Sequence, residues 1–431
     1  MNKHLATAVV LLVALATSYG AWGAEGGDSN EESFTLGIYG NANMDGTIDE
    51  MDIAYVEGVI NSTNAATNLS DANYDGKVDS GDLDQIRQII RGDEGELTLI
   101  DDSVTSEYPE GKPVTIRMPA NRIIALHADS AEVLMLLQSK DKIIGIADTT
   151  ANSTKSLPGI CELPTVGSSS DPDAEMIIQM KPDIVLAYGH DLSKWTTDLE
   201  KKLNGSDIAL VRLSCYQPET MSSDVIKLGY IVNNVARATE YVDWYEGYLS
   251  ILNEKIATLK EDDKPKVYVE RSKYMTYSKG SAAHNICQMA GGSNIATDLD
   301  GMYPQVDPEW VITQNPDIIL KTATSNTIKG GYEDDDPAEM KAAWEEIMNR
   351  SELANVKAVK DNKVYLIHTA GVWNNPEYFI GIIYLGKWFH PGLFEDLDPM
   401  TIHQEFVSRF LGLDYDLSKH GVFVYPPLQK N

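Results

Sequence analysis

Two short loops near the N-terminus carry oxygen-bearing side chains at the spacing that a hard cation requires. In such a loop, side-chain oxygens at positions 1, 3, 5, 9 and 12 and the main-chain carbonyl of position 7 surround Ca²⁺, while glycine at position 6 allows the turn. The ligand positions are Asn41, Asn43, Asp45, Thr47, Asp49 and Asp52 in the first loop and Asp71, Asn73, Asp75, Lys77, Asp79 and Asp82 in the second. Because the second loop repeats the first in register, the sequence predicts two calcium sites.

An apolar helical segment follows each loop, so the repeated unit is a loop and then a helix. Its apolar residues are Ile53, Val56, Val59 and Ile60 in the first copy and Leu83, Ile86, Ile89 and Ile90 in the second. This duplicated unit, with Asp at position 12, resembles the dockerin domains and is assigned to residues 36–95, the small domain. The resemblance implies an all-α calcium-binding domain whose partner is a cohesin module on another surface protein.

Two departures within the repeat bear on that partner. Position 1 of the first loop is Asn41, where the family has Asp, and this removes one charge from the site. The family's partner-contacting positions 10 and 11 hold Glu50 and Met51 in the first loop but Ser80 and Gly81 in the second. The alternative interpretation is a calcium-stabilised spacer that contacts only the large domain of its own chain.

A second internal repeat places one glutamate in each half of the remaining chain. Residues 175–186 (EMIIQMKPDIVL) match residues 309–320 (EWVITQNPDIIL), and each copy predicts a short helix, a Pro-Asp break and a buried strand. An aspartate two residues earlier is suited to cap each helix, with Glu175 or Glu309 in the first turn. The helix dipole explains why an acid is tolerated there, but it does not explain the matched placement in both halves.

Strands alternate with helices from residue 97 onward, which predicts an α/β fold with parallel sheets covered on both faces. A hairpin is expected at residues 97–100 and 113–118, and further strands at 122–126, 143–147, 183–188, 209–213, 266–269, 317–321 and 363–367. Residues 224–260 contain no proline and have apolar residues at helical spacing. They predict one connecting helix (residues 223–262) of roughly 55 Å. It would join lobe 1 (residues 97–222) to lobe 2 (residues 263–431).

The region from residue 97 to the C-terminus resembles the class III substrate-binding proteins of ABC importers, the group for iron-siderophores, haem and cobalamin. The motifs that carry the resemblance are residues 122–126 (RIIAL), 131–137 (AEVLMLL), 181–185 (KPDIV), 290–295 (AGGSNI) and 303–306 (YPQV). The resemblance implies two Rossmann-like lobes joined by one long helix. It also implies that Glu175 and Glu309 dock onto arginines of an ABC permease. The C-terminal residues 387–427 resemble archaeal, methanogen-like members.

The ligand site is expected beyond the carboxyl ends of the strands. Candidate ligand-binding residues there are His127, Asp129, His190, Arg271, Tyr274 and Trp373, and the resemblance adds Tyr303. Aromatic walls with a few polar groups suit an iron chelate such as a siderophore or a tetrapyrrole, and Arg271 is suited to a ligand carboxylate. The resemblance puts cobalamin in doubt, because Ser169 stands where cobalamin-binding members have tryptophan. A bare metal ion ranks lower, because no third ligand joins the two histidines by spacing.

Each candidate also has an ordinary structural explanation. The histidines could cap strand ends, Arg271 could pair with a neighbouring acid, and Tyr303 and Trp373 could pack in the core. The sequence contains no Gly-x-Ser-x-Gly, phosphate loop or His-Glu-x-x-His motif, so no enzyme is predicted. Two classes remain: a solute receptor with a dockerin anchor, or a cell-surface interaction protein that acts mainly through its dockerin.

The N-terminal residues predict a secreted chain associated with the cell surface, and the net charge is compatible with that setting. Residues 1–23 predict a signal peptide, either cleaved or retained as an anchor, and residues 24–35 a flexible acidic linker. The 35 Lys and Arg against 65 Asp and Glu give a net charge of −30, which argues against a nucleic-acid partner. Three cysteines are too few, and odd in number, for a disulfide framework.

Overall fold

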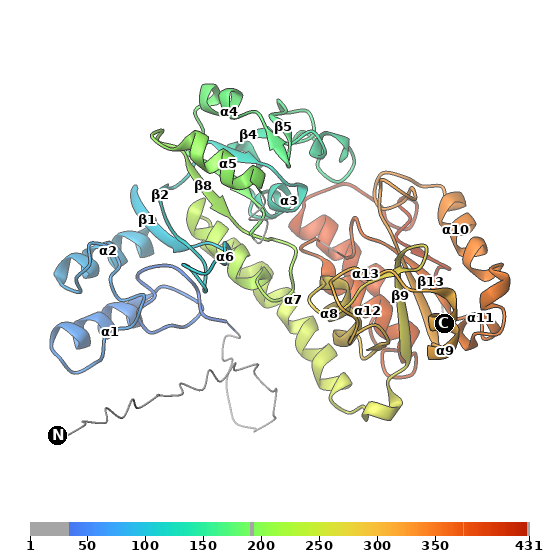
Figure 1. The fold of residues 1–431 in the computed structure, drawn as a ribbon. Coiled ribbons are helices and arrows are strands. Elements are labelled where there is room, and N and C mark those ends of the chain that lie inside the picture. The colour runs from blue at the N-terminus through green and yellow to red at the C-terminus, as the bar shows by residue number, and fades with distance from the viewer. Residues whose placement is uncertain (1–33, 190–193, 374, 429–431) are drawn as a thin grey trace, which may run out of the picture. The chain divides into compact units, whose positions relative to one another are not determined.

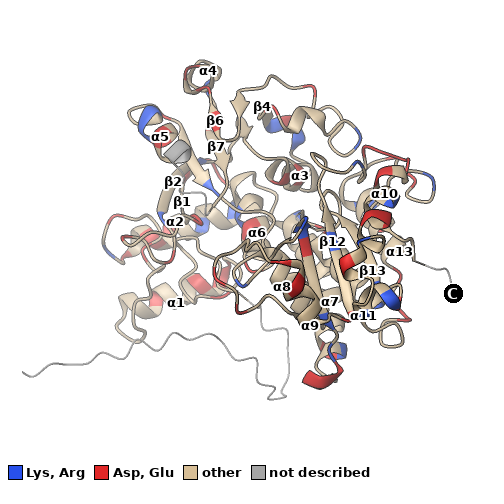
Figure 2. Cartoon of the chain, turned by 45° about the vertical axis from the view of Figure 1, so that its right-hand side comes forward, with Lys and Arg blue, Asp and Glu red and all other residues tan. Residues whose placement is uncertain are grey.

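The computed structural model describes residues 34–189, 194–373 and 375–428 (Figure 1). The predicted signal peptide and His190 lie outside these residues. Phe34–Asn431 forms one compact unit. None of the helices in the described ranges combines the length and the apolar character needed to cross a bilayer. Asp and Glu are spread over the small domain and both lobes (Figure 2), in keeping with the net charge of −30.

The small domain consists of the two expected loops, each followed by a helix: α1 (Glu50–Ile60) and α2 (Ser80–Arg91). The acids at loop positions 9 and 12 also begin the helices. Asp49 is the N-cap of α1 and forms a capping box with Asp52, and Asp79 and Asp82 do the same for α2. The helix therefore follows the loop because the same carboxylates satisfy its first N–H groups.

The small domain is joined to lobe 1 by main-chain pairing. β1 (Gly95–Ile100) and β2 (Pro113–Met118) form the predicted hairpin, and residues 37–39 pair with the outer edge of β1. The Tyr39 N–H donates to the Thr98 carbonyl (2.9 Å), and the Ile100 N–H donates to the Gly37 carbonyl (2.8 Å). The buried residues of the small domain belong to the same hydrophobic cluster as those of lobe 1. The small domain and lobe 1 therefore share one hydrophobic core.

Lobe 1 contains a four-stranded parallel sheet in the order β4–β3–β7–β8. Its strands are β3 (Ile123–Ala125), β4 (Ile143–Ile146), β7 (Ile184–Ala187) and β8 (Ala209–Arg212). Its helices are α3 (Ala128–Leu136), α4 (Ala174–Met180), α5 (Lys194–Leu203) and α6 (Met221–Ile231), and β5 (Gly167–Ser168) pairs with β6 (Asp171–Pro172) in a small hairpin. All four sheet strands lie at the predicted positions.

Lobe 2 contains a six-stranded mixed sheet in the order β10–β9–β12–β13–β14, with β11 also paired to β9. Its strands are β9 (Lys266–Ser272), β10 (Met275–Thr276), β11 (Ser293–Asn294), β12 (Ile318–Ala323), β13 (Val364–His368) and β14 (Val424–Tyr425). Its helices are α8 (Ala282–Met289), α9 (Pro308–Gln314), α10 (Ala338–Met348), α11 (Lys357–Lys360), α12 (Tyr378–Phe389) and α13 (Pro399–Glu405). The predicted strands β9, β12 and β13 are parallel, whereas β10 and β14 are antiparallel.

The single connecting helix predicted for residues 223–262 is wrong. The segment forms α6 and α7 (Val235–Ile256), separated at Asn233, whose φ of 58° is left-handed. Asparagine tolerates this conformation, and the Asn234 N–H donates back to the Gly229 carbonyl (2.7 Å). The Ser222 hydroxyl contacts Tyr245 and Glu246, so α6 folds back along α7 and belongs to lobe 1. The connection is α7 alone, with 22 residues, which corresponds to about 33 Å.

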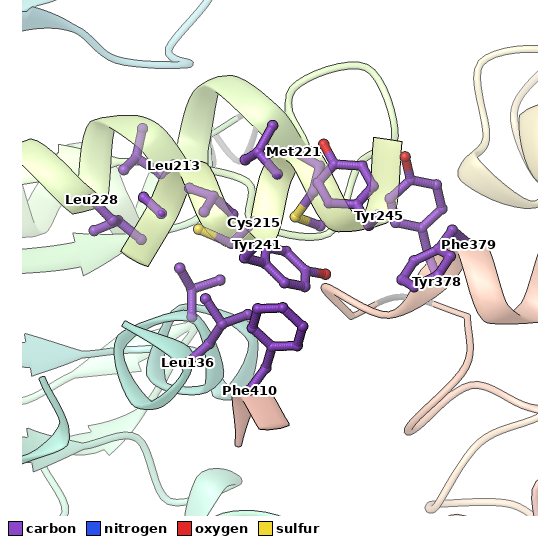
Figure 3. Packing of buried hydrophobic residues seen from close by; sticks show 14 of the residues in the cluster. Leu136, Leu213, Cys215, Met221, Leu228, Tyr241, Tyr245, Tyr378, Phe379 and Phe410 are labelled. Carbon is purple, nitrogen blue, oxygen red and sulfur yellow. The ribbon is translucent and has the colours of Figure 1, made fainter. Parts of the chain in front are cut away.

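One hydrophobic core packs against one face of α7 and continues into both lobes (Figure 3). Tyr241 and Tyr245 of α7 pack against Phe410 and Phe379 of lobe 2, and the Tyr241 hydroxyl donates to the Pro376 carbonyl (2.6 Å). Interiors of this kind are close-packed and resist continuous deformation. Because the lobes are joined through this packed core, we expect them to close only slightly on a ligand.

Candidate functional site

The two Pro-Asp breaks hold equivalent helices in the two lobes. The Asp183 carboxylate accepts the N–H groups of Asn121 and Arg122 (2.7 and 2.9 Å) just before β3, and Asp317 accepts the Lys266 N–H (2.9 Å) at the start of β9. Each helix ends in a left-handed residue, Lys181 after α4 and Asn315 after α9. The sequence repeat therefore corresponds to a repeated structural unit that ties a helix and a strand to the first strand of each sheet.

The glutamates predicted to dock onto the permease are exposed on these helices. Glu175 lies in the first turn of α4, where Asp173 accepts the N–H groups of Glu175 and Met176 (both 3.0 Å). Glu309 lies in the first turn of α9 after Pro308. Both side chains are exposed, and within the described residues neither carboxylate has an ion pair. Each is therefore available to a partner.

In lobe 1, the strand ends bring together His127, Asp129, Tyr188 and Tyr216. The Tyr188 hydroxyl donates to Asp129 (2.6 Å), its ring stacks on His127, and Tyr216 contacts Tyr188 edge-on. Burial lowers the pKa of His127 to about 3, so the imidazole is neutral. Burial also raises the pKa of Asp129 to about 7. Tyr188 was missed by sequence reasoning, although its position at the end of an apolar run before Gly189 was a usable signal.

In lobe 2, Arg271 and Tyr303 form a cationic and aromatic pair. The Arg271 guanidinium lies 4.5 Å from the centre of the Tyr303 ring, and Tyr277 contacts Tyr303 edge-on. Tyr303 is 46% exposed, so the pair is open to a ligand. Burial raises the pKa of Tyr216 to about 12, and Tyr303 is among the groups that act on it. The aromatic residues of the two lobes therefore lie within electrostatic reach of each other.

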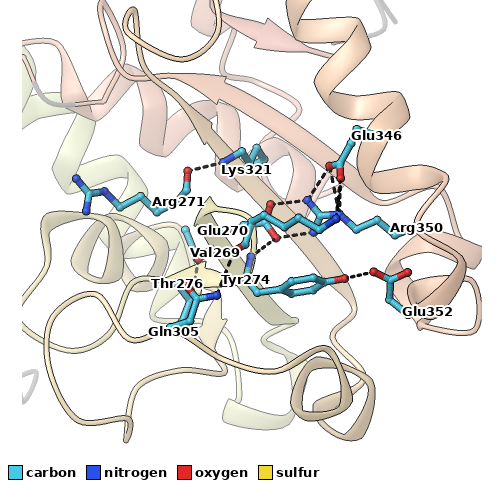
Figure 4. Close-up of polar contacts among 11 residues, drawn as sticks. Val269, Glu270, Arg271, Tyr274, Thr276, Gln305, Lys321, Glu346, Arg350 and Glu352 are labelled. Carbon is cyan, nitrogen blue, oxygen red and sulfur yellow. Dashed lines mark hydrogen bonds and ion pairs between the residues drawn. The ribbon is translucent and has the colours of Figure 1, made fainter.

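A buried ion-pair network determines which way Arg271 points. Glu270 precedes it on β9 and forms two hydrogen bonds with Arg350 (2.6 and 2.9 Å), which also binds Glu346. Neighbouring side chains on a strand point to opposite faces. The Arg271 guanidinium is directed away from the Glu270–Arg350 pair (Figure 4). The network thus explains why Arg271 does not pair with that neighbouring acid.

Two of the predicted ligand residues, Tyr274 and Trp373, are packed against other parts of the fold and do not join the strand-end group. Tyr274 is 6% exposed, lies against the Arg350 guanidinium and donates to Glu352 (2.6 Å), on the core side of the sheet. Trp373 is 1% exposed and packs in the hydrophobic core. Tyr274 and Trp373 were predicted to contact the ligand because they follow strands. A position after a strand does not determine whether the side chain points to the ligand site or into the core.

The lobes also meet through a buried acid that sequence reasoning did not select. Glu132 of α3 accepts a hydrogen bond from the Asn375 amide of lobe 2 (2.7 Å), and Glu377 lies beside it. Burial raises the pKa of Glu132 to about 7 and that of Glu377 well above its usual range. A shared proton would allow these two carboxyl groups to coexist at the junction of the lobes.

Two cavities lie away from the group of residues at the carboxyl ends of the strands. A groove of about 1170 Å³ runs along β2, α5 and the start of β8. A cavity of about 470 Å³ lies between the small domain and the connection from β8 to α6. We assign the ligand site to the strand ends instead, because ligands in open α/β sheets bind beyond the carboxyl ends of the strands, whereas the groove borders their amino ends.

In the second loop of the small domain, two of the predicted calcium ligands accept main-chain N–H groups of their own loop. Asp71 accepts the N–H groups of Asp75 and Gly76 (3.1 and 2.8 Å), and Asp75 accepts that of Lys77 (3.0 Å). Burial raises the pKa of Asp82, and the charge on Asp71 raises it further. Acids that repel one another in this way favour a bound cation.

The first loop has acids at the same positions except position 1, where Asn41 stands, and it is more buried. The Asn41 amide donates to the carbonyls of Leu36 (2.8 Å) and Asp45 (2.6 Å), while its side-chain oxygen is buried without a hydrogen-bond donor. Burial raises the pKa of Asp52 to about 6. Within the described ranges no three His, Cys, Asp or Glu side chains converge on one point. The loops therefore fit a hard cation only through mixed carboxylate, amide and main-chain oxygens.

The fold and the strand-end residues define a two-lobed solute-binding protein. The pattern of the Periplasmic binding protein family matches residues 123–370, and the chain belongs to this family. Its relatives are solute-binding proteins, which agrees with the prediction that the chain is not an enzyme.

Three relatives illustrate the similarity. The Bacillus subtilis uncharacterized ABC transporter substrate-binding lipoprotein YvrC is 23% identical over 68% of this chain and 87% of its own length. The Haemophilus influenzae molybdate-binding protein MolA is 22% identical over 74% of this chain and 93% of its own. The crystal structure of the TroA-like periplasmic binding protein FepB from Veillonella parvula covers 78% of this chain and 99% of its own, with 21% identity and a TM-score of 0.65. This last likeness shows the fold.

Proposed function

We propose that this chain is an extracytoplasmic receptor that binds a metal chelate between its lobes and delivers it to an ABC permease. The observation that carries the proposal is the matched pair of α4 and α9, each with an exposed glutamate in its first turn that has no ion pair in the described part of the chain. A protein whose large domain were only a passive support would not need the same acid on both lobes. The printed name of YvrC describes an ABC transporter substrate-binding protein, which agrees with this role.

The chemistry of the strand ends favours an anionic chelate with flat aromatic or conjugated parts. Tyr188, Tyr216 and Tyr303 supply aromatic faces, and Arg271 supplies a cation. Arginine suits carboxylate or catecholate groups because its guanidinium presents paired donors. Neutral His127 adds a nitrogen suited to iron. Ferric siderophores and haem share these features, whereas corrinoids share only the flat conjugated part. MolA is named for molybdate, so an oxyanion is the alternative that experiment must separate.

A screen for thermal stabilisation tests the ligand class. The purified chain would be heated with ferric siderophores, haem, corrinoids, molybdate and free metal ions, with absorbance spectra recorded in parallel. A specific ligand at ~100 times its Kd stabilises the folded state by ~2.7 kcal/mol, and the melting temperature should rise with its concentration. A response to molybdate alone would replace the chelate with an oxyanion as the ligand.

The Arg271→Met variant tests the cationic contact. Loss of a charge-assisted hydrogen bond of ~1.5–3 kcal/mol should weaken binding of an anionic chelate roughly 10- to 100-fold. Lys273→Met is the matched control, because Lys273 is an exposed cation close by that lies outside the proposed site. Equal affinity of Arg271→Met and wild type would show that Arg271 takes no part.

We also propose that the small domain binds two calcium ions and attaches the chain to a cohesin-bearing surface protein. The exposed second loop favours this role, because its ligand positions Asn73, Asp75 and Asp79 face solvent. Calorimetry should detect calcium binding that Asp71→Ala and Asp75→Ala abolish at the second loop. Purified cohesins should then be retained with calcium and released by a chelator. A chain that takes up no calcium would contradict both parts of the proposal.

A further inference from the structure

The helices α4 and α9, called the docking helices below, each carry an exposed isoleucine one turn after the glutamate. Ile178 follows Glu175 on α4, Ile312 follows Glu309 on α9, and both isoleucines are 40% exposed. Residues three apart on a helix share one face. Each helix therefore presents an acid and a large apolar side chain side by side.

The exposed isoleucines are not needed for folding of these helices. The residue before each of them, Ile177 or Val311, is fully buried and anchors its helix to the sheet. The pattern of buried, intermediate and exposed residues over 175–183 repeats residue by residue over 309–317. Packing accounts for Ile177 and Val311, but it leaves the two isoleucines at the solvent without a partner in their own lobe.

We propose that Ile178 and Ile312 are apolar anchors of the contact with the permease. The proposal rests on the proposed function and adds the chemistry of the partner: at each of two equivalent places, the permease presents a cationic side chain beside an apolar surface. Charge complementarity argues for this occupant, because each isoleucine adjoins an exposed carboxylate that has no ion pair among the described residues.

The isoleucines would give the contact an affinity that its ion pairs cannot supply alone. Exposed ion pairs contribute little to affinity and are screened by salt. Burial of an isoleucine side chain contributes more and does not depend on ionic strength. The glutamates would then set the orientation and speed of docking, while the isoleucines would hold the complex together.

The test uses the ABC permease whose ATP hydrolysis the full chain stimulates. With this permease held in nanodiscs, the affinity of the full chain for it is measured at low and at high salt. Ile178→Ala combined with Ile312→Ala should weaken binding roughly 30-fold, because truncation of a central apolar anchor costs about fivefold or more each. The loss should persist at ~0.5 M salt, where the Debye length falls to a few ångströms. Ile251→Ala on α7 is the control, since Ile251 is 38% exposed and should have no effect.

The glutamate variants separate this inference from the proposed function. If Glu175→Ala with Glu309→Ala weakens binding but the isoleucine variant binds as wild type, the apolar anchors are overturned and the receptor role stands. If neither pair of substitutions changes binding, the proposal that α4 and α9 contact the permease is wrong. Equal melting temperatures of all variants would show that the changes act on the contact and not on the fold.

Discussion

The two loops of the small domain have the same sequence pattern but different surroundings. In the first loop, Asn41 and Ile48 are buried, and the Ile48 N–H donates to the Tyr230 hydroxyl on α6 (2.8 Å). In the second loop, Asn73, Asp75 and Lys77 are exposed. One copy of the repeat thus lies against lobe 1, and the other faces solvent.

This difference shows how a duplication can be divided between two tasks. Asn41 suits the first loop because its amide links two carbonyls, of Leu36 and Asp45, which a carboxylate could not do. The first copy is therefore a joint to lobe 1. The second copy keeps Asp71 at position 1 and an open surface. Its surroundings leave it free for the attachment role proposed above.

The largest expected effect comes from removal of the matched position-12 acids. Asp52→Ala leaves the N–H groups of Asn43 and Asp49 without their acceptor. These two half-buried groups would lose their acceptor at a cost of ~1–3 kcal/mol each, so the free energy of unfolding should fall by ~2–6 kcal/mol. Asp82→Ala leaves equivalent groups in the exposed loop, where water can replace the acceptor, and the loss should be ~1 kcal/mol.

Chemical denaturation in the presence of a calcium chelator measures this difference without a contribution from the ion. Hydrogen exchange would locate it: Asp52→Ala should loosen α6 of lobe 1 as well as the first loop, whereas Asp82→Ala should affect the second loop alone. Equal losses for the two variants would mean that the first loop is not the joint.

A smaller effect is expected from the contact between the first loop and lobe 1. Tyr230→Phe removes the hydroxyl that accepts the Ile48 N–H and should lower the free energy of unfolding by ~1–2 kcal/mol. The Ile48 amide should also exchange faster with solvent. Tyr74→Phe in the second loop is the matched control, because Tyr74 is 47% exposed and a surface change of this kind stays within ~0.5 kcal/mol. A similar loss from both variants would remove the distinction between the loops.

The helices and strands of this fold were predictable where residues next to them in the sequence mark their ends. The strands β7 and β12 follow Pro-Asp pairs, and the structure explains those pairs through the hydrogen bonds that Asp183 and Asp317 accept. The helices α1 and α2 follow from carboxylates that serve as caps. In each case, the signal and the element are neighbours in the chain.

The errors arose where distant parts of the chain decide the outcome. The apolar spacing continues through Asn233 because α6 and α7 share one core, so periodicity could not reveal that the chain reverses there. Two consecutive asparagines, Asn233 and Asn234, were the available signal. Trp373 was assigned to the ligand site although packing with other elements buries it. The helices α4 and α9 were predicted, but the exposure of Ile178 and Ile312 could be seen only in the structure.

The smallest expected effect is a pH dependence of stability that differs between the first and second loops. Burial raises the pKa of Asp52 to about 6, whereas an unfolded Asp titrates near ~3.9. The folded state then binds the proton more tightly, so this group's contribution to stability is complete below pH ~4 and is lost as the pH rises through about 6. Without calcium, the denaturation midpoint of wild type relative to Asp52→Asn should therefore fall over this range.

Calcium should reverse that trend, because only the ionised carboxylate binds the cation and its affinity rises with pH. The comparison with Asp52→Asn is needed because burial lowers the pKa of His127 and His403, whose contributions have the opposite sign below pH ~6.5. Asp82→Asn should show the same dependence with a smaller amplitude, since its loop faces solvent. The contrary result is a difference in denaturation midpoint between wild type and Asp52→Asn that stays constant from pH 4 to 7 without calcium. It would show that burial in the first loop does not favour the protonated form of Asp52. The two loops would then be electrostatically equivalent.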